Sequence, residues 1–191
     1  MRFRFGIPMC LPVDKLAKQE QLPTQLNSTQ PKKMIRNTIA SDTEALMSIV
    51  ESSGQFDPES LDHVRSTLLE YLEGHSSGIW LTADDGEPIG VAYCAPEPVT
   101  NGTWNLLMLW TRKDRMGQGH GKALVEKIES ELVRRGMRLL IVETSGLPEF
   151  ESALAFYARI GFTPEARIRN FFAAGDDKIV LTKPIEQPAS V

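Results

Sequence analysis

Three glycines stand at alternate positions in the segment RMGQGHGK (residues 115–122), directly before a charged and amphipathic stretch. Glycine loses more conformational entropy on folding than other residues, so this cluster indicates backbone that must approach a ligand or adopt unusual angles. The first turn of a helix also offers unpaired N–H groups and the positive end of the helix dipole, which together attract phosphate. The spacing predicts a phosphate-binding loop, with a flexible connector as the alternative.

The common nucleotide-binding motifs do not fit this loop. A P-loop needs glycine at position 116 and serine or threonine at position 123, where this chain has Met116 and Ala123. The spacing G-x-G-x-G also differs from the dinucleotide fingerprint G-x-G-x-x-G. Because the three histidines are scattered along the chain and the chain has only two cysteines, we expect no metal site.

The elements around the loop predict where it lies in the fold. TWNLLMLWT (residues 103–111), a nearly continuous apolar run, predicts a strand buried on both faces directly before the loop. A helix follows, with Val125 and Ile128 on its apolar face, and it ends at Gly136. RLLIVE (residues 138–143) predicts the next strand. Together these elements form a βαβ unit, whose loop lies at the carboxyl edge of the sheet, where ligands bind.

The rest of the chain predicts further strands and the helices that cover them. One helix opens at a capping box formed by Ser41 and Glu44, and the next begins with Asp57 as its cap and Pro58 in its first position. The other expected elements are a short strand at 34–40, a hairpin within 78–98, a helix within 149–162, and an antiparallel strand pair at 166–172 and 178–183.

Two segments together resemble a known family. RMGQGHGKALVEKIE (residues 115–129) follows a buried strand, and ALAFYARIGF (residues 153–162) comes later in the chain. In this order they resemble the two signature segments of the GNAT superfamily of acetyl-CoA-dependent N-acetyltransferases. The resemblance extends over residues 34–183. It implies an α/β GNAT fold, with a mixed sheet of six to seven strands flanked by about four helices.

The resemblance also implies where acetyl-CoA, the co-substrate, binds. The glycine loop offers backbone N–H groups to the CoA pyrophosphate, and the end of the preceding strand pairs its backbone with the pantetheine arm. Met116 departs from the family pattern, because glutamine or arginine usually stands at its position. The predicted cofactor-binding residues are Leu109, Trp110, Thr111, Arg115, Met116, Gly117, Gln118, Gly119, His120, Gly121 and Lys122.

The same resemblance assigns the catalytic residues. Tyr157 occupies the family's tyrosine position, where a hydroxyl protonates the departing CoA thiolate; a tyrosine that only packs in the core is the alternative. Relatives often carry a basic carboxylate on the strand before the loop, but this strand has Asn105 and no acid. Glu143 is the nearest acid to the expected site, followed by Glu149 and Glu97. An amine that arrives deprotonated would need no base from the protein.

We therefore expect an N-acetyltransferase that moves the acetyl group of acetyl-CoA to a primary amine by direct attack. A covalent intermediate on cysteine is not expected, because Cys94 lies on a strand away from both motifs. The acceptor is a small-molecule or peptide amine, slightly favoured as a cation by four acids near the expected acceptor pocket, Asp57, Glu59, Asp176 and Asp177. The alternative function is a non-catalytic module that binds CoA or acetyl-CoA as a sensor or interaction domain.

Composition excludes several classes of function. The formal net charge of -4 and the 24% of charged residues give no support for binding to nucleic acid or to an anionic membrane. No apolar run approaches the roughly 18 residues that a membrane-spanning helix needs. The opening MRFRFGIPMCLPV is basic and apolar, and the segment KQEQLPTQLNSTQPKK that follows is polar and glutamine-rich. Residues 1–33 are therefore predicted to be a disordered leader, with a targeting segment left open, and residues 184–191 a C-terminal tail. We expect a cytoplasmic protein that is a monomer or a homodimer.

Overall fold

The computed structural model describes residues 34–187, and the predicted leader at 1–33 lies outside these residues, as do positions 188–191. A mixed seven-stranded sheet forms the centre, in the order β1-β2-β3-β4-β5-β7-β6. Every neighbouring pair is antiparallel except β4 and β5, which are parallel. The strands are β1 (Met34–Asn37), β2 (Ile79–Asp84), β3 (Pro88–Pro96), β4 (Thr103–Thr111), β5 (Leu139–Ser145), β6 (Thr163–Ala173) and β7 (Asp176–Pro184). The predicted α/β sheet of six to seven strands is confirmed.

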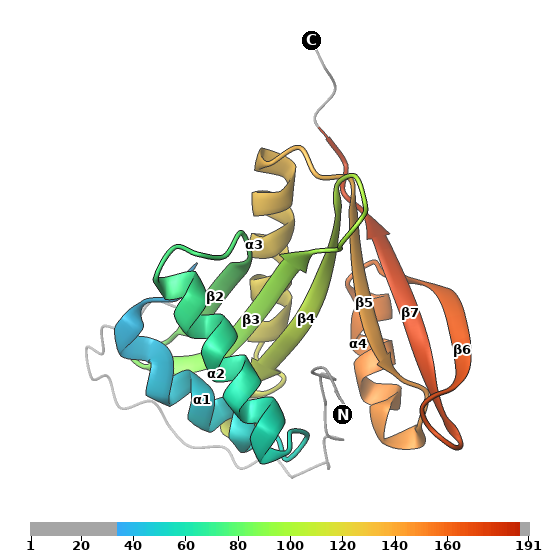
Figure 1. Ribbon diagram of the computed structural model, residues 1–191, viewed down its shortest axis with the longest axis horizontal. Helices are drawn as coiled ribbons and strands as arrows, with labels where there is room; N and C mark the ends of the chain where they lie inside the picture. Colours follow the sequence, from blue (N-terminus) through green and yellow to red (C-terminus); the bar gives the residue numbers. More distant parts are fainter. Residues whose placement is uncertain (1–33, 188–191) are drawn as a thin grey trace, which may run out of the picture.

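Four α-helices cover the two faces of the sheet, as Figure 1 shows. Helices α1 (Thr43–Glu51) and α2 (Pro58–Leu72) pack on one face, where Leu46 and Leu68 join a core cluster with Trp80 and Met108. Helices α3 (His120–Arg134) and α4 (Glu151–Arg159) cover the other face and contribute to a larger core cluster. Ile185, beyond the domain boundary expected from the sequence, also packs in this larger cluster.

The start of α1 differs from the predicted capping box. Ser41 lies inside a short 3-10 helix, η1 (Ala40–Asp42), and α1 begins at Thr43. The carboxylate of Asp42 instead accepts the backbone N–H of Ile39 at 3.0 Å. At α2 the prediction is correct, because Asp57 Oδ1 accepts the backbone N–H of Ser60 at 2.8 Å. Ser41 therefore does not cap α1, because the neighbouring carboxylate of Asp42 has stronger hydrogen-bond partners.

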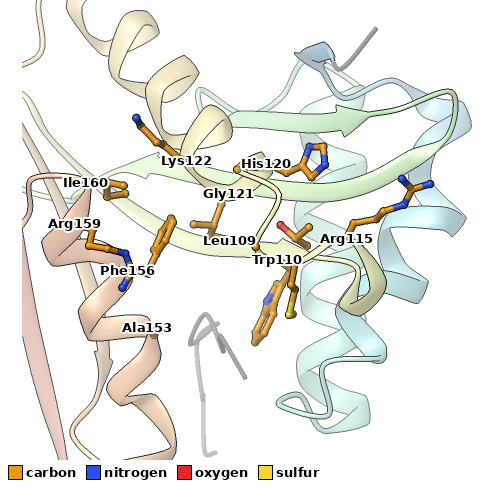
Figure 2. A pocket seen from close by; sticks show the side chains of 14 residues that line it. Leu109, Trp110, Arg115, His120, Gly121, Lys122, Ala153, Phe156, Arg159 and Ile160 are labelled. Carbon is orange, nitrogen blue, oxygen red and sulfur yellow. The ribbon is translucent and has the colours of Figure 1, made fainter. Parts of the chain in front are cut away.

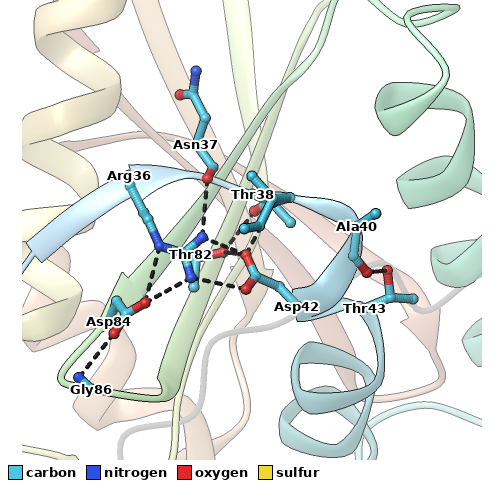
Figure 3. Close-up of polar contacts among 10 residues, drawn as sticks. Arg36, Asn37, Thr38, Ala40, Asp42, Thr43, Thr82, Asp84 and Gly86 are labelled. Carbon is cyan, nitrogen blue, oxygen red and sulfur yellow. Dashed lines mark hydrogen bonds and ion pairs between the residues drawn. The ribbon is translucent and has the colours of Figure 1, made fainter.

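Those stronger partners form a buried polar network around Asp42, drawn in Figure 3. The guanidinium of Arg36 on β1 lies between two carboxylates, 2.6 Å from Asp42 and 2.7 Å from Asp84. The hydroxyl of Thr82 donates to Asp42 at 3.0 Å and bonds to the hydroxyl of Thr38 at 2.9 Å. Burial opposes ionisation of Asp42, but the hydrogen bonds from Arg36, Ile39 and Thr82 outweigh it. The pKa of Asp42 therefore lies below its ordinary value.

A bulge in β4 separates this strand from its parallel neighbour. The register between β3 and β4 shifts at Tyr93 and Cys94, which pair with Met108 and Leu106, so Leu107 is the extra residue. Within the described chain, β4 and β5 pair only along residues 103–105 of β4. Figure 1 shows the two strands close at one end and well apart at the other. The edge of β4 after the bulge is therefore open toward α4.

Candidate active site

A cavity of about 360 Å³ lies at this open edge of β4. Its walls are the end of β4, the glycine loop with the first turn of α3, and one face of α4, as seen in Figure 2. All of the predicted cofactor-binding residues line it except Gln118, whose side chain donates to the carbonyl of Asp114 at 3.3 Å. Ten of the eleven residues predicted from the sequence to bind the cofactor therefore lie around one cavity.

The α4 wall was not predicted from the sequence. Ala153, Phe156, Arg159 and Ile160 line the cavity, and Figure 2 shows Phe156 and Arg159 projecting from α4 beside Leu109 of β4. Positions 153, 156 and 160 share one helix face, so helical spacing carried a signal. That spacing alone does not say whether the face meets the core or a cavity, since the answer depends on how far β5 lies from β4.

The glycines of the loop serve two different purposes. Gly117 and Gly119 have φ angles of 72° and 88°, in the left-handed region that other residues resist, and a Cβ on either would meet no protein atom within 4 Å. Gly121 has no such angle, but a Cβ there would lie 3.4 Å from the ring of Phe156. The first two glycines therefore set the backbone path, and the third brings α3 close to α4.

The N-terminus of α3 borders the cavity, and its N-cap residue offers no capping side chain. Gly119 is the N-cap, and because it has no side chain it cannot accept a hydrogen bond from the first turn. The first backbone bond into the helix runs from the N–H of Ala123 to the carbonyl of Gly119, at 3.0 Å. The first N–H groups of a helix have no partner within the helix, and together with the positive end of the helix dipole they favour an anion. The first turn also carries no acidic residue.

Three cationic side chains line the same cavity. Arg115 contacts Asp85 at 3.1 Å, and Lys122 contacts Glu126 at 3.5 Å. Arg159 is exposed and forms no ion pair within the described part of the chain. Arg115 and Lys122 are thus partly neutralised by carboxylates, whereas within the described chain the charge of Arg159 is not. This excess of positive charge along the cavity suits a ligand with several negative charges.

A buried donor also lies beside the cavity. Trp110 lines it with only 3% of its surface exposed, and its indole N–H has no hydrogen-bond partner among residues 34–187. Buried donors are rarely left without a partner in native structures. An elongated ligand with phosphates at one end and amide or carbonyl groups along its length therefore suits this cavity.

The family assignment now follows from comparison with known proteins. The family model described as "Acetyltransferase (GNAT) family" matches residues 43–162. The chain belongs to the GNAT acetyltransferase family. No curated protein matches the chain in sequence.

Solved GNAT structures share the fold. A GNAT-family protein from Desulfovibrio desulfuricans is 31% identical with a TM-score of 0.76, covering 81% of this chain and 99% of its own. The ribosomal-protein-S18-alanine N-acetyltransferase of Escherichia coli is 21% identical with a TM-score of 0.63, over 83% and 97% of the two chains. A Salmonella typhimurium protein, yncA, was solved with acetyl-CoA; it is 15% identical with a TM-score of 0.66, over 84% and 98%.

Tyr157, the predicted proton donor, lies behind the cavity wall rather than on it. It follows Ala153 by one turn of α4, is fully buried, and packs edge-on against Phe156 and Phe162 with ring centroids 5.2 and 5.3 Å away. Phe150, just before α4, is likewise buried. These contacts support the alternative that Tyr157 is a packing residue of the core. Proton donation by its hydroxyl stays a prediction.

The candidate bases do not reach this GNAT cavity. Glu143 on β5 forms an ion pair with Lys178 of β7 at 2.8 Å and does not line the cavity. Glu97 accepts a hydrogen bond from the side chain of Asn105 at 3.2 Å, and Glu149 is exposed. Burial raises the pKa of the Cys94 thiol, which disfavours a thiolate nucleophile there.

Neither a candidate metal site nor a candidate membrane-spanning helix occurs among the described residues. Among the described residues, no group of three or more His, Cys, Asp or Glu side chains could hold a metal ion. None of the helices within 34–187 is long and apolar enough to cross a membrane.

Proposed function

We propose that this GNAT acetyltransferase uses acetyl-CoA as its donor and a primary amine as its acceptor. One observation carries the proposal: the N-terminus of α3, whose N-cap is a glycine, forms a wall of the cavity where β4 and β5 separate. The pyrophosphate would lie against the backbone of residues 117–122, with Arg115 and Lys122 beside it. The pantetheine arm would run along the open edge of β4, where its amides replace the missing partner strand.

The reaction proposed is a direct transfer between the two substrates. The neutral amine nitrogen attacks the thioester carbon, a C–N bond forms, the C–S bond breaks, and CoA leaves as a thiolate. The proton lost by the amine balances the one that the thiolate takes up. An enzyme-bound acetyl intermediate is not needed, and the buried thiol of Cys94 offers no nucleophile for one.

The protein does not need to supply the base in this proposal. The carboxylate of Glu143 is held by Lys178, so accepting a proton would require breaking that ion pair. An amine that loses its proton before binding avoids this cost. We therefore treat Glu143 as a weak candidate for the base.

Tyr157 remains the proposed proton donor, supported by its position one turn from Ala153 in the cavity wall. Replacing Tyr157 with phenylalanine should leave the affinity for acetyl-CoA nearly unchanged, because the buried ring and its aromatic contacts survive. We expect kcat to fall about 10-fold, less than a positioned proton donor typically contributes, because a thiolate is a fair leaving group unaided. Steady-state and single-turnover kinetics with one amine measure the change.

The matched control for this substitution is Tyr71→Phe, which removes a hydroxyl from a half-buried tyrosine of α2 that does not line the cavity. The control should keep wild-type kcat. If Tyr157→Phe also keeps wild-type kcat in single turnover, Tyr157 is a packing residue. A rise in KM for acetyl-CoA alone would make it a binding residue.

A non-catalytic CoA-binding module is the second candidate. The observation that favours it is that neither Glu143 nor Glu97 presents a free carboxylate to the cavity. Calorimetry with acetyl-CoA, followed by thiol release in a panel of primary amines, separates the two. Binding with transfer to any amine supports the enzyme, whereas binding without transfer to the whole panel supports the module.

A further inference from the structure

A second cavity, of about 300 Å³, lies on the other side of β4, between α2 and the sheet. Its lining is mostly apolar and aromatic. Trp80 and Tyr93 stack with ring centroids 4.4 Å apart, and Phe56, Val64 and Met108 complete the apolar wall. We call this space the aromatic cavity. No acidic side chain of the described residues lines it.

Strand β4 separates the aromatic cavity from the first cavity, which we call the donor cavity because we propose that acetyl-CoA binds there. Leu107, the extra residue of the bulge, lines the aromatic cavity, while residues 109–111 line the donor cavity. The edge contact between Phe56 and Trp110, with ring centroids 6.3 Å apart, joins a wall of one cavity to a wall of the other. A molecule held in the aromatic cavity thus lies next to the strand that borders the donor.

The acids that would favour a cationic acceptor are mostly committed elsewhere. Asp57 caps α2. Asp176 accepts a hydrogen bond from the buried hydroxyl of Ser145, and Asp177 binds Arg167 and the backbone N–H of Asn170. Only Glu59 of the four has no hydrogen bond or ion pair in the described part of the chain. Charge therefore contributes little to selecting the acceptor.

We propose that the aromatic cavity holds the apolar body of the acceptor, so that the preferred substrate is a primary amine on an aromatic group. This rests on the proposed function. Aromatic walls gain from offset or edge-on contact with another ring, beyond the area that they bury. The same chemistry is found in a free arylalkylamine and in a peptide with an aromatic N-terminal residue. A polyamine, with several charges and no apolar body, would meet no carboxylate among the described residues that line this cavity and would leave its apolar walls unfilled.

The test compares amines on the full-length protein with saturating acetyl-CoA. The probes are 2-phenylethylamine, ethylamine, spermidine and a short peptide with N-terminal phenylalanine. We expect kcat/KM for 2-phenylethylamine to exceed that for ethylamine by about 10- to 100-fold, from burial of one ring. The peptide arm then separates the sources: comparable kcat/KM identifies a peptide acceptor, and a much lower value a free amine.

A cavity-filling variant tests the location. Val64→Trp places a ring into the aromatic cavity from a half-buried position on α2, and it should lower kcat/KM for 2-phenylethylamine at least 10-fold. Ser66→Trp, at an exposed position of the same helix that does not line the cavity, is the matched control and should change little. Thermal melts and acetyl-CoA affinity should be unchanged in both variants.

Direct binding keeps this inference separate from the proposed function. Calorimetry of 2-phenylethylamine with the CoA-saturated protein should show binding that Val64→Trp removes and Ser66→Trp keeps. Binding without acetyl transfer would support the aromatic cavity and overturn the enzyme proposal. Transfer to spermidine or ethylamine as fast as to 2-phenylethylamine, or equal loss in both variants, would overturn the aromatic cavity and leave acetyl transfer standing. If 2-phenylethylamine neither binds nor is acetylated, the aromatic cavity is also overturned as the acceptor site.

Discussion

Gly119→Asp should weaken acetyl-CoA binding by at least about 100-fold. The substitution places a carboxylate at the N-terminus of α3, where we propose that the pyrophosphate lies, and like charges brought together cost several kcal/mol. It also puts a side chain on a residue with a φ of 88°, which adds strain of about 1 kcal/mol. Calorimetry on the folded variant measures the loss.

The control is Gly119→Asn, which has nearly the same shape without the charge and tolerates the left-handed region equally well. A Cβ at position 119 meets no protein atom within 4 Å, so both variants should fold. We expect the asparagine variant to lose far less affinity than the aspartate variant. Equal affinity for acetyl-CoA in the wild type and the aspartate variant would show that the pyrophosphate does not bind at this loop.

Asp42→Ala should destabilise the protein by about 3 kcal/mol at neutral pH. The substitution leaves the part-buried guanidinium of Arg36 with only Asp84, and it removes the acceptor of the Ile39 N–H and the Thr82 hydroxyl. Breaking one partner of a buried ion pair typically costs this much, because the other charge keeps its desolvation cost. Urea unfolding of the two proteins measures the difference.

The pH dependence of this difference has a definite sign. The pKa of Asp42 is lowered in the folded protein from its ordinary 3.8, so its contribution is fully present above that value. It is lost as pH falls through the lower, folded pKa. The gap between wild type and Asp42→Ala should therefore be constant from neutral pH to about pH 5 and shrink in more acidic solution.

Glu44→Ala is the contrasting variant. Glu44 pairs with Arg65 at 2.6 Å, but its side chain is 80% exposed, and exposed pairs contribute little to stability. We expect little change in the unfolding midpoint. If Asp42→Ala were as mild as Glu44→Ala at pH 7, the network around Arg36 would contribute specificity rather than stability.

The glycine loop was predictable because its signal is local. The spacing of Gly117 and Gly119 after an apolar strand reports backbone angles and the start of a helix, which depend on neighbours in the chain. The cap at Asp57 was predictable for the same reason. The role of Gly121 was not predictable in this way, because it depends on the ring of Phe156 on α4. The cap at Ser41 was wrong because Arg36, on a different element, draws Asp42 into the buried network instead.

The α4 wall and the aromatic cavity could not be read in the same way. The run TWNLLMLWT is apolar throughout, so it has no alternation in which a register shift at Leu107 would be visible. That shift decides where β4 leaves β5, and hence that Phe156 and Arg159 meet a cavity rather than a strand. The partner of Glu143 was equally hidden, because β7 inserts between β5 and β6 and brings Lys178 beside it.

The short parallel contact between β4 and β5 has a further consequence, for hydrogen exchange. Within the described chain, three residue pairs join these strands, so the amides of β4 beyond residue 105 that point away from β3 have no strand partner. A donor that lies along this edge would supply the missing acceptors and would also bind the folded state alone. Acetyl-CoA should therefore slow hydrogen exchange of those amides within residues 106–111. The unfolding temperature should also rise with the concentration of acetyl-CoA. Occupancy of the cavity would thus be coupled to cohesion between the two halves of the sheet.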